Sequence, residues 1–298
     1  MHWCRLRSVI LAAVAASVLA ACGTATGPAG DGDGGDGSSA APDVAEPTRE
    51  LVAHGIVMQS DPDARVELCV GPVATSYPPQ CSGPGLSGEF SWDDVEAQDS
   101  AGVRWTDVTY YAVGTFDRAT DTFTLTRPLS AEPPPGLEPT TPTEVEFPQL
   151  CDDPFRGGDP AFTDDAAAQE RLQQRLDTLD GLVATWVSDG ASLFNVIVTG
   201  EPEEAFASLR EVWPGGLCVE QRDLPTAAEV AAAQTAVMER ADDIGLLSSA
   251  GGVDGRLEVH VVVADAETTS LVHDTVAPWL TPREVRLLSA FVPLAAKG

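Results

Sequence analysis

Hydrophobic and polar residues alternate in short runs between residues 51 and 127, and glycine, proline or aspartate separates one run from the next. Alternation with a period of two, together with β-branched and aromatic residues, is typical of strands that bury one face. The pattern predicts four strands, at Gly55–Gln59, Arg65–Val70, Thr109–Thr115 and Thr122–Thr126. We expect these strands to form a small antiparallel sheet or barrel.

A helical period begins after residue 160. Apolar residues recur there at intervals of three and four, at Leu172, Leu176, Leu179, Val183 and Trp186. This spacing predicts one amphipathic helix, because it places the five side chains on one face. Thr163 is the expected N-cap, Asp164 and Asp165 suit the positive end of the helix dipole, and Gly190 is the expected stop.

Strands and helices alternate through the rest of the chain. Thr226 and Glu229 have the spacing of a capping box, and Asp265 is a second expected N-cap. The predicted elements are a strand at 194–199, a helix at 202–213, a strand at 217–219, a helix from 226 to about 244, a strand at 257–263, a helix from 265 to about 276 and a strand at 285–291.

Two β-α-β units follow from this order, because residues 194–219 and 257–291 repeat the same succession of elements. A duplicated unit is expected to place four strands in one sheet with helices packed on it. The predicted fold class is therefore α+β, with a small antiparallel β domain followed by an α/β sandwich of duplicated β-α-β units, ferredoxin-like in outline.

Composition divides the chain into five predicted segments. Residues 1–21 are expected to be a signal peptide, and 22–48 a lipid anchor with a flexible tether of Gly, Ala and Asp. Residues 49–127 form the predicted β-rich domain, and 128–154 a linker that contains eight prolines. Residues 155–298 form the predicted α/β domain.

The amino terminus combines a basic and an apolar stretch. Arg5 and Arg7 precede the apolar run Val9–Leu19, which is too short to span a hydrocarbon core of roughly 30 Å. The run ends in Leu19-Ala20-Ala21-Cys22, which resembles the lipobox of bacterial lipoproteins. The resemblance implies cleavage after Ala21, attachment of a diacylglyceryl group to the Cys22 thiol and anchoring to the membrane through acyl chains such as palmitate. A coincidental cysteine after an ordinary secretory signal is the alternative.

The chain is strongly acidic. It has 17 Lys and Arg against 46 Asp and Glu, a formal net charge of −29. Removal of the signal with Arg5 and Arg7 leaves 15 basic residues against 46 acidic ones, a net charge of −31. Such a field repels nucleic acid and anionic lipid headgroups, so neither is expected as a partner of the folded part.

Four cysteines remain in the predicted mature chain after Cys22. An even number outside the cytosol predicts two disulfides, and three pairings are possible. We favour Cys69 with Cys81 and Cys151 with Cys218, because each bridge then lies within one compositional segment or at its edge. No C-x-x-C or clustered Cys/His spacing occurs, so neither a zinc site nor a redox pair is expected.

The first of these bridges would close a loop rich in proline and glycine, at residues 71–88. Tyr77, Pro78 and Pro79 in this loop are candidate recognition residues, because binding residues concentrate on loops that a rigid scaffold holds. A loop that only covers one end of the sheet is the alternative. Trp92 and Trp105 are candidates for a sugar-stacking platform or, alternatively, for core positions.

Motifs for catalysis are absent from the sequence. There is no G-x-S-x-G, S-x-x-K, G-K-[ST] or H-E-x-x-H pattern, and no cofactor or metal is expected. Of the histidines, His260 and His273 are expected to be surface or structural residues. The adjacent carboxylate pairs at 93–94, 152–153, 164–165 and 242–243 are explained by acidic composition, so we nominate no catalytic residue.

These features favour a lipid-anchored lipoprotein on the outer face of the cell membrane. The expected role is a non-enzymatic binding or scaffold module of the cell envelope whose partner is an envelope protein or a cell-wall component. A carboxylate-dependent cell-wall hydrolase, which needs two convergent carboxyl groups in a cleft, is the alternative. Beyond the lipobox, the body resembles two-domain lipoproteins of actinobacterial type, a resemblance that carries over no residue roles.

Overall fold

The computed structural model of the protein describes residues 49–137, 147–162 and 165–294. These residues form mainly β-strands. The strands of the first half are β1 (Leu51–Gln59), β2 (Glu67–Cys69), β3 (Gly85–Ser87), β4 (Ala97–Ser100), β5 (Val103–Thr106), β6 (Tyr110–Asp117) and β7 (Thr122–Leu125). Those of the second half are β8 (Leu182–Val187), β9 (Phe194–Val198), β10 (Leu217–Gln221), β11 (Leu246–Gly251), β12 (Leu257–Val261), β13 (Val285–Ser289) and β14 (Val292–Pro293).

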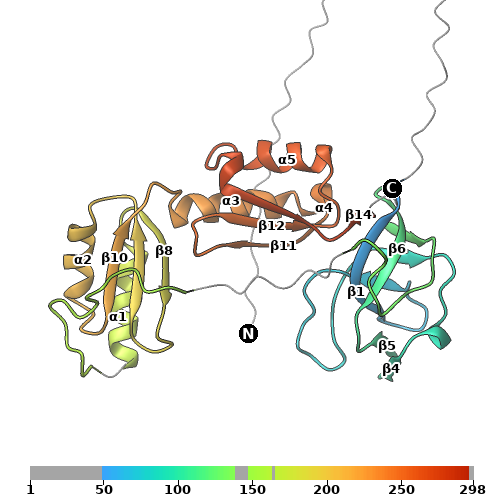
Figure 1. The fold of residues 1–298 in the computed structure, drawn as a ribbon, viewed down its shortest axis with the longest axis horizontal. Helices are drawn as coiled ribbons and strands as arrows, with labels where there is room; N and C mark the ends of the chain where they lie inside the picture. The colour runs from blue at the N-terminus through green and yellow to red at the C-terminus, as the bar shows by residue number, and fades with distance from the viewer. Residues whose placement is uncertain (1–48, 138–146, 163–164, 295–298) are drawn as a thin grey trace, which may run out of the picture. The chain divides into compact units, whose positions relative to one another are not determined.

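The α-helices of the described residues all lie in the second half. They are α1 (Ala166–Asp177), α2 (Pro202–Arg210), α3 (Ala227–Glu239), α4 (Ala241–Ile244) and α5 (Ala266–Val276). Two short 3₁₀ turns, at Trp92–Asp94 and Pro282–Glu284, complete the helical structure. Figure 1 shows the strands β1 and β6 in one group and the helices gathered around the other two sheets.

Five strands of the first half close into a barrel. Their pairing runs β1, β2, β3, β7, β6 and back to β1, and only the β3–β7 pair is parallel. Closure depends on β1, which pairs with β6 along its first half and with β2 near its end. The strands β4 and β5 extend the same sheet through the pairing of β5 with β1, and β14 pairs with the start of β1.

Close packing inside the barrel requires glycine on two of its strands. A Cβ at Gly55 of β1 would collide with the backbone carbonyl of Cys69, and a Cβ at Gly114 of β6 would collide with that of Thr124. Glycine in a strand marks such close approaches of one backbone to another. Both glycines therefore allow neighbouring strands to cross tightly at the barrel wall.

The barrel core contains residues from the end of the chain. Phe123 and Leu68 are fully buried there, together with Val57 and Ala112. Phe291 follows β13 and is also fully buried in this core, where its ring centroid lies 5.3 Å from that of Phe116 and 4.7 Å from that of Phe123. The barrel is thus completed by a segment that is more than 160 positions away in sequence.

A second sheet has the strand order β10-β9-β8. The strands β9 and β10 are parallel and joined by α2, and β8 pairs antiparallel with β9. Val196 and Val198 of β9 pack with Leu172 of α1 and Leu209 of α2, so both helices cover one face. Ile197 points to the opposite face, as the period of two requires.

A third sheet repeats this arrangement with the order β11-β12-β13. The strands β12 and β13 are parallel and joined by α5, and β11 pairs antiparallel with β12. Val259 and Val261 are fully buried against α3 and α5, whereas Glu258 and His260 between them lie on the other face. The predicted outward orientation of His260 is confirmed.

The predicted α+β class with one ferredoxin-like α/β sandwich is wrong. The chain is mostly β, with a closed five-stranded barrel and extra strands, and the two β-α-β units lie in two separate three-stranded sheets. The physical reason is that each unit begins with a hairpin. The strand β8 pairs with β9, and β11 pairs with β12. Each of these two hairpin strands occupies an edge at which the two units would have joined into a single four-stranded sheet.

Both hairpin strands were missed because their sequences imitate other patterns. The helix predicted to reach Trp186 ends at Asp177, and Gly181 follows it with a φ of +71°. Val183 and Trp186 are three positions apart, which is a helical spacing. In β8 a register shift between Leu182 and Ala184 allows both side chains to be buried. The small residues of β11 show no alternation in burial.

Helix starts followed the sequence signals more closely. The capping box of Thr226 and Glu229 begins α3, and Asp265 caps α5 through a 2.8 Å bond from the Thr268 N–H, so both predictions are confirmed. In α1 the observed N-cap is Asp165, whose carboxylate accepts the Ala168 N–H at 2.6 Å. The predicted cap Thr163 lies outside the described residues.

Candidate functional site

Both predicted disulfides are present. The Cα atoms of Cys69 and Cys81 lie 5.9 Å apart and those of Cys151 and Cys218 lie 5.5 Å apart, so the favoured pairing is confirmed. Disulfides persist in oxidising compartments, so the protein occupies an extracytoplasmic environment. In the part of the chain that the structure describes, no helix has the length and apolar character needed to cross a membrane. Cys22 and Ala21 lie outside that part.

The first disulfide staples the loop that contains the candidate recognition residues. Within it, the Ala74 N–H donates to the Gln80 carbonyl at 2.8 Å, and the Ser76 hydroxyl donates to the Pro78 carbonyl at 2.9 Å. Tyr77 at the tip is 75% exposed, although Pro78 and Pro79 beside it are half-buried. The loop therefore has an ordered base and presents one aromatic side chain to solvent.

Trp105 of β5 supports this tyrosine. Its ring is only 3% exposed, and the Tyr77 ring meets it edge-on with 5.5 Å between centroids. The Trp105 indole N–H donates to an Asp107 carboxylate oxygen at 2.8 Å, and the Gln98 amide donates to the other oxygen. Trp105 is thus a core residue and not an open sugar-stacking platform. The exposed groups at this point are therefore the Tyr77 ring and the Asp107 carboxylate, and the buried Trp105 contacts both of them.

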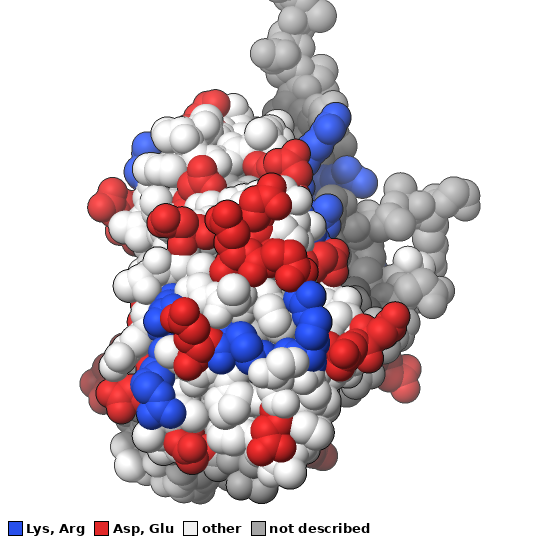
Figure 2. All heavy atoms as spheres, turned by 90° about the vertical axis from the view of Figure 1, so that its left-hand side faces the viewer, with Lys and Arg blue, Asp and Glu red and all other residues white. Residues whose placement is uncertain are grey.

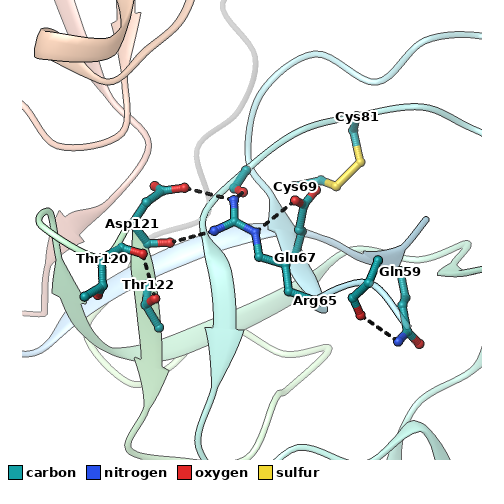
Figure 3. A network of polar contacts seen from close by, with 10 residues as sticks. Gln59, Arg65, Glu67, Cys69, Cys81, Thr120, Asp121 and Thr122 are labelled. Carbon is teal, nitrogen blue, oxygen red and sulfur yellow. Dashed lines mark hydrogen bonds and ion pairs between the residues drawn. A yellow bond between two sulfur atoms is a disulfide. The ribbon is translucent and has the colours of Figure 1, made fainter. Parts of the chain in front are cut away.

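A network centred on Arg65 fixes the end of the stapled loop (Figure 3). The guanidinium group donates to the Gly83 carbonyl at 3.3 Å, to the Asp121 carboxylate at 3.0 Å and to the Glu67 carboxylate at 3.1 Å. The hydrogen bond that Arg65 donates to the Asp121 carboxylate is the main cause of the raised pKa of Arg65, and the bond to Glu67 adds to it. Figure 3 shows the Cys69–Cys81 bridge beside this network, so a covalent and an ionic restraint hold the same loop.

The histidines have structural surroundings. His54 stacks on Tyr111 of the neighbouring strand with 4.2 Å between ring centroids, and burial lowers its pKa. His260 is 45% exposed and lies 4.0 Å from the Glu258 carboxylate. His273 is half-buried on α5. Among the residues that the structure describes, none of the three histidines is hydrogen-bonded to a serine, threonine or cysteine side chain.

The adjacent carboxylates do not converge on a common point. Asp93–Asp94, Asp152–Asp153 and Asp242–Asp243 are all exposed, and Asp165 is occupied as a helix cap. Asp164 lies outside the described residues. In the part of the chain that the structure describes, no group of three or more His, Cys, Asp or Glu side chains is arranged to hold a metal ion.

Carboxyl groups whose pKa departs from its ordinary value all have it lowered. They are Glu50, Asp189, Glu229 and Asp265. Burial opposes the shift in Asp189 and Asp265, but backbone N–H groups donate to the carboxylates and favour the ionised form. A general acid requires the opposite shift. These four groups therefore act as anchors for turns, caps and strands.

The sequence did not single out Asp107, Gln98 or Arg65. Trp105 and Asp107 are two positions apart, a spacing that places both side chains on one side of an extended chain and could have indicated their hydrogen bond. Gln98 and Arg65 carry no comparable local signal, because their partners lie on other segments of the barrel.

No known protein family, curated protein or solved structure matches this chain.

Proposed function

We propose that the protein is a lipid-anchored lipoprotein of the cell envelope and acts there as a non-enzymatic binding or scaffold module. The lipobox-like Leu19–Cys22 and the Gly, Ala and Asp tether after it support anchoring through Cys22. Two disulfides support folding outside the cytoplasm. The tether would hold the folded part away from the headgroups, and the partner would be an envelope protein or a cell-wall component.

The exposed ring of Tyr77 carries this proposal. This large aromatic side chain is 75% exposed on a cross-linked loop, and among the described residues its ring contact is the edge-on contact with Trp105. Aromatic residues on pre-ordered loops are typical anchors of interfaces, because little conformational entropy is lost when they bind. The contact surface is therefore the stapled loop with Tyr77 at its centre.

Charge around this surface favours a basic partner. Asp107 lies against Trp105, and Asp99 on β4 pairs with Arg104 on the neighbouring strand. The whole chain carries a net charge of −29, and Figure 2 shows acidic patches, with basic residues among them, on the face that it draws. Complementary potentials accelerate encounter and exclude like-charged partners. A partner segment with Lys or Arg beside an apolar contact fits Tyr77 and its carboxylate rim.

Crosslinking on intact cells tests the contact surface. Photo-crosslinking from the stapled loop of the anchored protein should attach discrete partners, and Tyr77→Ala should reduce their yield about tenfold or more. Thr75→Ala is the matched control, because Thr75 is an exposed residue of the same loop. Equal yields from wild type and Tyr77→Ala would remove Tyr77 from the proposal.

The same experiment separates anchoring from binding. Cys22→Ser removes the thiol that would carry the lipid, so this variant should leave the membrane fraction and still capture the partner through the loop. A Cys22→Ser protein that stays with the membrane would contradict lipid anchoring.

A further inference from the structure

A cavity of about 430 Å³ lies where the barrel meets the third sheet. Arg65, Phe116 and Arg118 line it from the barrel, and Asp242, Leu246 and Val262 line it from the carboxyl-terminal part. Its volume falls within the range of roughly 300–1,000 Å³ that is typical of small-molecule sites. Ser82, Gly83 and Pro84 at the end of the stapled loop belong to its lining, but the exposed Tyr77 does not, so the cavity is distinct from the contact proposed at Tyr77.

The two walls are fixed to one another. Arg118 follows β6 and donates to the Asp265 carboxylate at 2.9 Å and to the Thr268 hydroxyl at 2.7 Å. Val262 is 6% exposed and belongs to the barrel core together with Phe291. The cavity is therefore held open by an ion pair and by apolar packing, and a ligand would meet a pre-formed site.

The guanidinium group of Arg118 in this cavity has N–H groups that are not used in hydrogen bonds. Both hydrogen bonds of the Arg118 guanidinium come from Nη2, and its Nε and Nη1 have no partner among the described residues. Its side chain is 39% exposed, so these N–H groups are open to a ligand. The guanidinium of Arg65, by contrast, is engaged with Asp121, Glu67 and Gly83.

One anion in the cavity is unpaired. Asp242 makes no hydrogen bond or ion pair with any residue that the structure describes, whereas its neighbour Asp243 pairs with Arg240 at 2.7 Å. The other carboxylates of the lining, Glu67 and Asp121, share the single charge of Arg65. The groups of the cavity that keep unused bonding capacity are thus the spare N–H groups of Arg118, whose charge is paired with Asp265, and the carboxylate of Asp242.

Apolar side chains form the rest of the surface. Phe116, Leu246, Leu247 and Val262 line the same space. A simple anion such as phosphate would satisfy Arg118 but would be repelled by Asp242 and by the acidic chain as a whole. A simple cation would satisfy Asp242 but would leave the spare N–H groups of Arg118 and the apolar side chains without a partner. Only a ligand with both charges and an apolar body satisfies all three parts of the lining.

We infer that this cavity binds a short peptide with free termini and apolar side chains. Its carboxylate would accept N–H groups from Arg118, its ammonium group would pair with Asp242, and its side chains would lie on Phe116 and Val262. The volume exceeds what one small amino acid fills, so a dipeptide is the expected minimum ligand. This inference does not depend on the proposed function of the Tyr77 surface.

Isothermal titration of the full-length, disulfide-intact protein tests the inference with a set of matched probes. Leu-Leu should bind saturably, and free leucine more weakly. N-acetyl-Leu-Leu lacks the ammonium group and Leu-Leu amide lacks the carboxylate, so each should bind about tenfold more weakly or worse, which corresponds to about 1.4 kcal/mol per lost pair.

Variants assign each end of the ligand. Asp242→Asn should weaken Leu-Leu to the level of N-acetyl-Leu-Leu and leave the affinity for N-acetyl-Leu-Leu unchanged, and Asp243→Asn is the control that should change neither. Asp242 is exposed and makes no hydrogen bond or ion pair with a described residue, and asparagine keeps its size, so this variant should fold as the wild type does. Arg118→Lys provides the second arm: it keeps the positive charge but loses the spare guanidinium N–H groups, so it should narrow the difference in affinity between Leu-Leu and its amide.

Two results would overturn the inference. The first is the absence of saturable binding of Leu-Leu to the wild type at millimolar concentration. The second is equal affinity for the free and the end-blocked peptides, which would show that apolar contacts act without the two charges. Neither result bears on partner capture by the Tyr77 loop, so the two proposals fail independently.

Discussion

Asn195 shows how much a single buried residue determines in this structure. It is the only asparagine of the chain and is fully buried on β9. Its side-chain oxygen accepts the Leu150 N–H at 2.8 Å, and its amide donates to the Ser188 hydroxyl at 2.9 Å. One side chain thereby ties the segment before Cys151 to the centre of the second sheet.

We expect Asn195→Ala to lower the free energy of unfolding by about 2 kcal/mol, because the buried Leu150 N–H loses its acceptor. Urea denaturation of the disulfide-intact protein measures this change. Gln173→Ala is the control, since Gln173 bonds only to Asp177 on the exposed face of α1 and should cost less than about 0.5 kcal/mol. A cost as small as that of the control would show that water or a shifted chain satisfies the Leu150 N–H.

Residue-scale features were predictable from sequence where the signal was local. The cysteine pairing followed from compositional segments, and the exposure of Tyr77 followed from its position in a proline- and glycine-rich loop. The sequence does hold a signal for the unpaired state of Asp242. Arg240 lies three positions before Asp243, the spacing that brings side chains together on a helix, and only two positions before Asp242.

At the scale of an element, the capping box of α3 shows how two side chains fix the start of a helix. The Thr226 hydroxyl accepts the Glu229 N–H at 3.2 Å, and the Glu229 carboxylate accepts the Thr226 N–H at 2.8 Å. These bonds to Thr226 lower the pKa of Glu229. A lowered folded-state pKa contributes stability above the unfolded value of about 4.5, and this contribution is lost as the pH falls through the folded value.

Thr226→Ala should therefore cost about 1 kcal/mol at neutral pH and less at pH 3, because acidification weakens the carboxylate half of the capping box. Thermal unfolding of both proteins at the two pH values measures the difference. Thr226→Ser keeps the hydroxyl and should remain close to the wild type. A cost that does not change with pH would mean that the cap acts without its carboxylate.

Elements were predicted well where capping and periodicity agreed, and poorly where they conflicted. The starts of α3 and α5 had both signals. For β8 the two signals were misleading. Val183 and Trp186 are three positions apart, as on one face of a helix, and the end of the helix before Gly181 was not predicted. The short strands β3 and β5 were not predicted, because glycines, prolines and turns surround them, although β3 is needed to close the barrel.

At the scale of the whole molecule, the unexpected feature is the contribution of the last strands to the first domain. Nothing in the alternation around residues 285–293 indicates that Phe291 belongs to the barrel and not to its own sheet. The pairing of β14 with β1 at Leu51–Pro293 and Val52–Val292 is a contact between the two ends of the described chain. Contacts of such sequence separation leave no periodic trace, so the predicted boundaries at 127 and 155 could not include them.

This arrangement predicts that a substitution near the carboxyl terminus destabilises the barrel. Phe291→Ala removes a fully buried ring from between Phe116 and Phe123 and should cost about 3–5 kcal/mol. Amide hydrogen exchange locates the effect, because protection should fall most along β6 and β7, whereas β9 and β10 have their own core and should retain theirs.

Leu288→Ala is the matched control, since Leu288 lies three residues earlier and is 37% exposed, so its truncation should leave protection in the barrel unchanged. If Phe291→Ala instead lowered protection only in β12 and β13, the carboxyl-terminal segment would be a passive cover of the barrel. Because Arg118 and Val262 share this junction, the same loss of barrel protection should accompany loss of peptide binding in the cavity. Binding that survived in Phe291→Ala would show that the ion pair of Arg118 with Asp265 is sufficient to hold the two walls together.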